Sequence, residues 1–332
     1  MTWIPLLLAD RSPNLRLLVL RHLLNRPDGE EIAELEKIRE TDPLVVQLLR
    51  SQATDGSWGS IQATAQALLR FGYFGFDSGY PAVRRGAEFL FRLRQPDGSW
   101  PLPGNSPDGG EGATYQMIPL QTAIPLRGLA ACGYAADPRA EKAYDWLLKQ
   151  RLEDGAWPAG IAHGNYGYVA GYRRLAHSRW GCRSNTTGAL LCLAHHPGLC
   201  RGPEARRALD LLLACEMGER RHLGFETARI TGAEEMRGFF TYYARYDMAQ
   251  VLDLCRRIGA SSADDRAAQI IKQVKELRGP YGLWQYAPKP QVNRWVTYDI
   301  LSSLSGITGD ADWISMEPRT PFISYPERKK RY

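Results

Sequence analysis

Three carboxyl side chains, Glu111, Asp247 and Asp299, lie among aromatic and basic residues in long polar connections of the chain. A carboxyl group near aromatic rings can donate or accept a proton, because apolar surroundings raise its pKa toward neutrality. Side chains that could line a cavity with these acids are Tyr115, His163, His177, Trp180, Arg183, Tyr243, Arg245, Tyr246, Arg294, Trp295 and Tyr298. Aromatic faces bury apolar chains and arginine binds anions, so we expect a ligand cavity with Asp247 as acid or base and Asp299 beside it.

A metal site is the second kind of chemistry that the residue types allow. Zinc is held by cysteine, histidine and carboxylate side chains, and Cys182 with His177 is the candidate pair here. The six cysteines form no Cys-x-x-Cys pair and are too few for a disulfide scaffold. We therefore predict no cofactor, with zinc at Cys182 and His177 as the alternative.

An internal repeat sets the positions of these residues along the chain. The same pattern occurs in the segments 48–58, 91–100 and 146–157. A largely apolar run is followed by Gln, then by two to four residues, and then by Gly-x-Trp. Degenerate copies end at Phe225 and Trp284, which brings the repeat to about five copies. Such self-similarity is typical of arrays built from one supersecondary unit, in which insertions gather on a face that often binds the ligand.

One copy of the repeat reads as a pair of helices. Apolar residues at helical spacing predict helices over 83–93, 139–150 and 205–215. The Asp-Gly that follows makes a turn in which glycine adopts a positive φ, and the Trp after it has a large face to bury. A threonine is then expected to start the next helix as its N-cap, at Thr64, Thr122, Thr187 and Thr297. No strand pattern of useful length is found, so the predicted fold class is all-α.

These segments resemble the Gln-Trp (QW) motif of the terpenoid cyclase and prenyltransferase superfamily, as in squalene-hopene cyclases. In that motif a basic residue, Gly or Ala, an aromatic and Gln precede Gly-x-Trp, and Arg85-Gly86 and Lys142-Ala143 match its leading pair. The resemblance covers roughly residues 45–310. It implies an α/α toroid, a barrel of helix pairs whose inner helices surround a cavity, and a small apolar or isoprenoid ligand in an aromatic-lined centre.

The acid motif of the cyclases is not reproduced at the matching positions. Cyclases that protonate an alkene or epoxide carry a D-x-D-D box before a Thr-Ala helix start, whereas residues 60–63, 119–121 and 184–186 hold no carboxylate. The resemblance therefore implies a cyclase- or transferase-like reaction without the usual alkene-protonating acid. Two alternatives stay open: a non-catalytic toroid that binds a ligand or a protein, and a carbohydrate-active hydrolase or lyase that pairs Glu111 with Asp247 or Asp299.

Composition and charge set the remaining expectations. The chain has 332 residues, of which 44% are hydrophobic and 23% charged, and its net charge is +6. We expect an N-terminal helical extension over 1–44, the toroid over 45–315, and a basic tail over 316–332 that can contact an anionic membrane. Elsewhere basic and acidic residues alternate, so no nucleic acid is expected as a partner. Without a signal peptide or a spanning segment, the chain is expected in the cytoplasm, and the sequence leaves its oligomeric state open.

Overall fold

The computed structural model describes residues 3–102, 115–214, 222–235, 238 and 241–307. Nearly all regular structure in these ranges is helical, and the strands among them form one short hairpin, β1 (Ile161–Ala162) and β2 (Asn165–Tyr166). The all-α prediction is therefore confirmed. No helix in the described ranges has the length and apolar character needed to cross a membrane.

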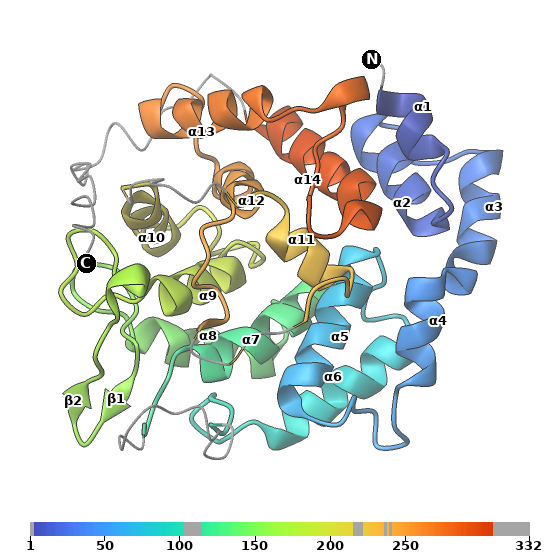
Figure 1. Cartoon of the computed structure of the whole chain (residues 1–332). Coiled ribbons are helices and arrows are strands. Elements are labelled where there is room, and N and C mark those ends of the chain that lie inside the picture. Colours follow the sequence, from blue (N-terminus) through green and yellow to red (C-terminus); the bar gives the residue numbers. More distant parts are fainter. Residues whose placement is uncertain (1–2, 103–114, 215–221, 236–237, 239–240, 308–332) are drawn as a thin grey trace.

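The helices form the two concentric layers of an α/α toroid (Figure 1). The inner layer consists of α5 (Ile61–Tyr73), α7 (Leu120–Leu129), α9 (Arg183–Leu193), α12 (Met248–Ile258) and α14 (Asn293–Gly306), with the short α11 (Phe225–Ile230) between α5 and α14. The outer layer consists of α4 (Pro43–Arg50), α6 (Pro81–Leu93), α8 (Pro138–Lys149), α10 (Pro203–Leu213) and α13 (Asp265–Glu276). Because the chain alternates between the layers, the long inner helices run in one direction and their C-terminal ends meet on the same side of the ring.

The outer and inner helices differ in their sequence patterns for a physical reason. The four outer helices from α4 to α10 begin at a proline, whose fixed φ suits the first helical position. The helices predicted over 83–93, 139–150 and 205–215 correspond to α6, α8 and α10 and begin one or two residues earlier. Every residue of α7 and α9 is buried, because these helices are covered by the outer layer on one side and by their neighbours on the other.

The tryptophans of the repeats bind both layers through the same two hydrogen bonds. In each repeat the indole Nε1 donates to the carbonyl oxygen ten residues earlier, at 2.6–2.9 Å, for Trp58, Trp100, Trp157 and Trp284. The backbone N–H of the same tryptophan donates to a threonine hydroxyl of the next inner helix at 2.9–3.3 Å, namely Thr64, Thr122, Thr186 and Thr297. One tryptophan therefore ties an outer helix to the following inner helix.

The N-cap role predicted for the threonines is wrong. Helix α5 begins at Ile61 with Ser60 as its N-cap, so Thr64 lies inside the first turn. In the third repeat the bonded residue is Thr186, one position before the predicted Thr187. The hydroxyl groups accept from the tryptophan backbone N–H instead of capping a helix.

The glycines of the Asp-Gly turns permit close contact between successive repeats. Gly56 and Gly98 have φ values of +91° and +102°. A Cβ atom would lie 2.5 Å from the carbonyl oxygen of Arg85 at the first position and 2.2 Å from that of Lys142 at the second. Only glycine allows each turn to pack directly on the backbone of the next outer helix.

The N-terminal extension contains three helical elements. They are α1 (Trp3–Leu8), α2 (Pro13–Leu18) continued by the π-helix η1 (Val19–Leu23), and α3 (Glu30–Ile38) continued by the 3-10 helix η2 (Arg39–Thr41). The sequence indicates the last two as helices over 14–25 and 29–40 but does not indicate α1. Because η1 packs against α14, this segment contributes to the inner layer as well as covering an edge. The domain division at residue 44 stays a prediction, and the basic tail over 316–332 lies outside the described residues.

Candidate functional site

A cavity of about 680 Å³ lies inside the ring, on the side where the inner helices have their C-terminal ends. All the long inner helices, α11 and η1 contribute to its lining. The exposed residues His22, Asn25, Gly75 and Ser305 mark its opening to solvent. The aromatic lining predicted from the sequence is not found. Apart from the imidazole rings of His22 and His195, the aromatic side chains of the described lining are those of Tyr73 and Tyr298, and its other residues are aliphatic, polar or charged.

Asp299 on α14 is a carboxyl group of the lining whose pKa is strongly raised. Tyr73 donates a hydrogen bond to its Oδ1 at 2.8 Å, and Thr227 donates to its Oδ2 at 2.6 Å. Burial raises the pKa of Asp299 to about 7, with a further increase from Asp253 and Asp247, although the two hydrogen bonds act in the opposite direction. A group with this pKa exchanges protons readily at neutral pH.

A buried ion-pair cluster forms another part of the wall. Glu226 accepts hydrogen bonds from Arg127 and from Arg229, the latter at 2.8 Å. Arg127 also donates to the hydroxyl of Tyr243 at 2.8 Å, and the Arg229 guanidinium lies 3.7 Å from the centre of the Tyr242 ring. Burial alone would raise the pKa of Glu226, but the charges of Arg229 and Arg127 outweigh it and lower the pKa. Glu226 is therefore an ionised structural partner and a poor proton donor.

A second ion-pair cluster lies on α12. Asp253 accepts hydrogen bonds from Arg256 at 2.6 Å and from Arg257 at 2.7 Å. Burial opposes ionisation of Asp253, yet the two guanidinium groups hold its pKa well below the usual range. Asp299 is thus the carboxyl group of the described lining that can carry a proton near neutral pH.

Asp247, the acid or base expected from the sequence, holds the backbone of α11 and α12 in place. Its carboxylate accepts three backbone hydrogen bonds, from Gly224 at 3.0 Å, Glu226 at 2.8 Å and Ala249 at 3.0 Å, and the residue is 2% exposed. It caps α12 and fixes the start of α11. Burial raises the pKa of Asp247 against these hydrogen bonds. Because it is not part of the cavity lining, a catalytic role does not fit this position.

Most of the other predicted site residues lie away from the cavity. Tyr298 is the exception and lines it, with its hydroxyl 2.7 Å from Nδ1 of His22. The remaining aromatic and histidine residues are buried in the core (Tyr243, Tyr246, Trp295) or lie in the loop around the β-hairpin (Tyr115, His163, His177, Trp180).

The three predicted arginines are likewise engaged elsewhere. Arg294 pairs with Asp10 at 3.1 Å, and Arg245 stacks 4.3 Å from the centre of the Phe225 ring. Arg183 is buried at the start of α9, 6.0 Å from the centre of the Tyr246 ring. These side chains lie at the N-terminal ends of the inner helices, opposite the cavity. The prediction that they meet an anionic group of the ligand there therefore does not agree with where the cavity lies.

The remaining predictions concern Glu111 and zinc. Glu111 lies outside the described residues, so its pairing with Asp247 or Asp299 stays a prediction. Cys182 is fully buried immediately before α9, and His177 is exposed in a loop. Among the residues that the structure describes, no group of three or more His, Cys, Asp and Glu side chains is arranged to hold a metal ion.

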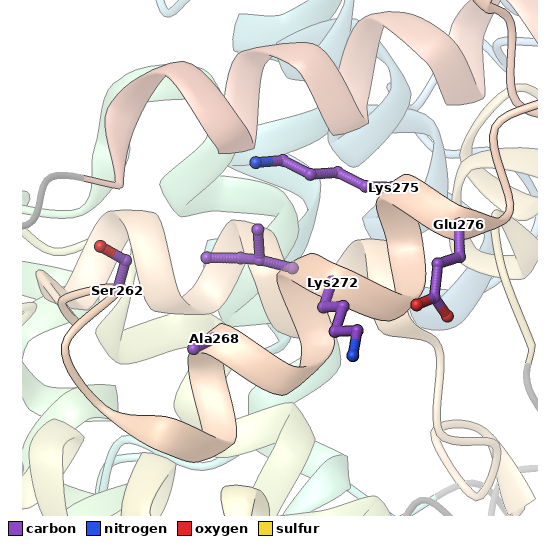
Figure 2. A pocket seen from close by; sticks show the side chains of 6 residues that line it. Ser262, Ala268, Lys272, Lys275 and Glu276 are labelled. Atoms are coloured by element: carbon purple, nitrogen blue, oxygen red, sulfur yellow. The ribbon is translucent and has the colours of Figure 1, made fainter.

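A second hollow lies on the outside of the ring. It is formed mainly by α13, and its lining residues are Ser262, Ala268, Ile271, Lys272, Lys275 and Glu276. Figure 2 shows Ala268, Lys272, Lys275 and Glu276 on that helix and Ser262 in the segment before it. Its polar groups belong to solvent-facing side chains rather than to converging buried ones. The central cavity is the better candidate site.

Sequence reasoning missed most of the groups around Asp299. Tyr73, Thr227, Arg127, Glu226 and Asp253 all lie within helices whose apolar pattern looks like ordinary core. A usable signal was present in α11, where Glu226 and Arg229 stand three residues apart in a fully buried segment. Charged residues inside an apolar helix are almost never buried unless paired, so they indicate an internal polar site.

The fold and the cavity define a toroid of the terpenoid cyclase superfamily. Residues 59–257 match the family model of the squalene-hopene cyclase C-terminal domain, which is more than half of the chain, and the chain belongs to this family. A probable squalene-hopene cyclase from Sinorhizobium fredii (strain NBRC 101917 / NGR234) is 28% identical over 130 residues, which are 34% of this chain and 19% of that relative. The match thus spans about a fifth of the relative's length.

Solved structures also resemble the chain at a general level. A protein from Actinoplanes is 15% identical, with 89% of both chains covered and a TM-score of 0.44. The apo form of the type II terpene cyclase MstE from Scytonema is 15% identical, with 89% of this chain and 87% of that chain covered and a TM-score of 0.45.

Proposed function

We propose that the chain binds an isoprenoid in the central cavity and that Asp299 transfers a proton to or from it. The observation that carries the proposal is the position of Asp299, which lines the cavity and has a pKa of about 7. A general acid or base works best when its pKa is near the working pH. The proposed proton transfer uses no metal or cofactor.

The lining supports an isoprenoid ligand in two ways. Leu69, Leu191 and Ile230 offer aliphatic surface to an apolar chain. Asp299, in its deprotonated form, accepts the proton that a cationic isoprenoid intermediate loses. Membership of a family named after a squalene cyclase agrees with this substrate class.

Asp299→Asn tests the proposal, with Asp247→Asn as the matched variant. The purified chain is incubated with geranylgeranyl diphosphate, geranylgeraniol and squalene, and the products are identified by gas chromatography and mass spectrometry. We expect Asp299→Asn to lower turnover by about 10²- to 10⁴-fold, the usual contribution of general acid–base catalysis, with little change in Tm. Asp247→Asn should lower Tm but keep the turnover of the folded fraction.

Two outcomes would overturn the proposal. Unchanged turnover in Asp299→Asn would remove Asp299 as the proton-transfer group. Binding of an isoprenoid by the wild-type chain without any product would favour the non-catalytic ligand-binding toroid.

A further inference from the structure

One loop of the chain exposes several aromatic side chains to solvent. Residues 159–182, which include the β1–β2 hairpin, form this aromatic loop. Tyr166, Tyr168 and Tyr172 are 43%, 72% and 53% exposed, and they are three of the seven exposed large hydrophobic side chains among the described residues. Exposed apolar side chains that gather in one place mark interaction surfaces. Tyrosine is also one of the residue types that contribute most to protein interfaces.

The aromatic loop is held in one conformation without a partner. His163 and Gly164 join the strands of the hairpin and have φ values of +49° and +77°, as in a two-residue type I′ turn. Ala159, Val169 and Cys182 form a small core inside the loop. A surface that is already ordered loses little conformational entropy when it binds.

Arginine side chains stack on the aromatic rings of this loop. The Arg179 guanidinium lies 4.9 Å from the centre of the Trp180 ring, whose centre is 6.0 Å from that of Tyr166. The Arg173 guanidinium lies 5.8 Å from the centre of the Tyr172 ring. The loop contains three arginines and two histidines but no Asp or Glu. It therefore suits a partner that offers acidic side chains around an apolar one.

Helix α3 presents such a surface. Residues 28–40 include six acidic and two basic residues. Glu30, Glu34 and Ile38 follow one another at four-residue spacing on the exposed side of the helix. Ile38 is 46% exposed, although it is apolar. The ion pairs that α3 makes with α2 and η1 use other glutamates of the helix.

We propose that the aromatic loop binds α3 of a second copy of this chain. Glu30 and Glu34 pair with arginines of the loop, and Ile38 packs among its tyrosine rings. The hairpin and α3 lie on opposite sides of the ring (Figure 1), so one copy does not bring its own two surfaces together. Different surfaces of two copies therefore meet, and this head-to-tail contact repeats into a closed ring or an open chain of copies. The association does not depend on proton transfer by Asp299.

Sedimentation of the purified full chain tests the proposal. Analytical ultracentrifugation is run over a range of protein concentrations in about 20 mM and about 500 mM salt, because salt screens charge pairs at a surface. At low salt we expect the average mass to rise with concentration above that of one chain. At high salt the rise should be smaller.

Two variants remove one surface each. Glu30→Gln/Glu34→Gln neutralises α3, and Tyr168→Ser/Arg179→Gln changes the aromatic loop. Each should weaken self-association by about tenfold or more, as is common for tyrosine and arginine side chains at interfaces. Because all four side chains are exposed, Tm should stay unchanged. An equimolar mixture of the two variants should form dimers and nothing larger, since each variant keeps the surface that the other has lost.

Arg278→Gln/Tyr281→Ser is the matched control, because both residues are exposed but belong to neither surface. It should associate as the wild type does. A wild-type mass that stays at one chain at every concentration would overturn the proposal, as would association that both surface variants retain or a mixture that stays monomeric. Flotation with phosphatidylserine vesicles that Tyr168→Ser/Arg179→Gln loses, without self-association, would show that a membrane and not a second copy binds the loop.

Discussion

The two ends of the inner helices differ in how their polar groups are used. At the N-terminal ends, the tryptophan N–H groups reach partners inside the repeat, and three backbone amides bind Asp247. At the C-terminal ends, two ion-pair clusters and the carboxyl group of Asp299, which has a pKa of about 7, border the cavity. The comparison shows that the repeat motif holds the ring together, whereas the groups that can act on a ligand lie at the opposite end.

The strongest test of this contrast is Trp157→Ala. Trp157 is fully buried and bonds to Leu147 and Thr186, so its removal leaves a large cavity and two broken hydrogen bonds. We expect the free energy of unfolding to fall by about 3–5 kcal/mol, as for other buried tryptophans, measured by urea denaturation. Trp180→Ala, in the loop by the hairpin, is the control and should cost far less. Similar losses in both variants would contradict a structural role specific to the repeat.

Titration of Asp299 should have a smaller effect on the free energy of unfolding, seen as its dependence on pH. Its pKa rises from 3.8 to about 7 on folding, so between these values the folded chain holds a proton that the unfolded chain has lost. The stability that this proton contributes is complete below the ordinary pKa and is lost as the pH rises through about 7. The loss is about 2 kcal/mol if solvent in the open cavity screens part of the effect.

The measurement is urea denaturation of the wild type and Asp299→Asn at several pH values from acid to mildly alkaline. Asparagine cannot titrate, so the variant should lack this part of the pH dependence. Parallel curves for the two proteins would show that Asp299 has an ordinary pKa. The C-terminal ends of the inner helices would then hold no group suited to proton transfer at neutral pH among the described carboxyl groups of the lining.

The smallest effect separates two neighbouring threonines. Thr186→Val removes the acceptor for the backbone N–H of Trp157 and should cost about 1 kcal/mol in the free energy of unfolding. Thr187→Val is the matched control, at the residue that the sequence pattern indicated, and should cost less. The reverse order in thermal denaturation would restore Thr187 as the bonded residue of the third repeat.

Much of the fold could be predicted because the repeat is local. An apolar stripe, an Asp-Gly turn and a buried tryptophan recur within about 12 residues of the chain, so each helix pair can be recognised on its own. The roles inside the repeat were harder to assign. A threonine at a helix start has the same appearance whether its hydroxyl caps the helix or accepts from a distant tryptophan.

The candidate site could be predicted only in part, since it depends on ring closure. Asp299 and Tyr298 were identified from their place on an inner helix. The hydrogen-bond partners of Asp299, Tyr73 and Thr227, lie 226 and 72 residues away in the chain. Arg256 and Arg257 follow a pattern that also describes a solvated helix face, and only the closed ring shows that this face borders a cavity.

The bond between each tryptophan and its threonine also bears on how such chains diversify. The same bond closes segments in which the two residues are 6, 22, 29 and 13 positions apart. The entropic penalty of closing a longer loop grows only with the logarithm of its length. Each closed segment can therefore gain or lose residues with little effect on the ring, and the protein carries several independent positions at which evolution or an engineer can insert new sequence.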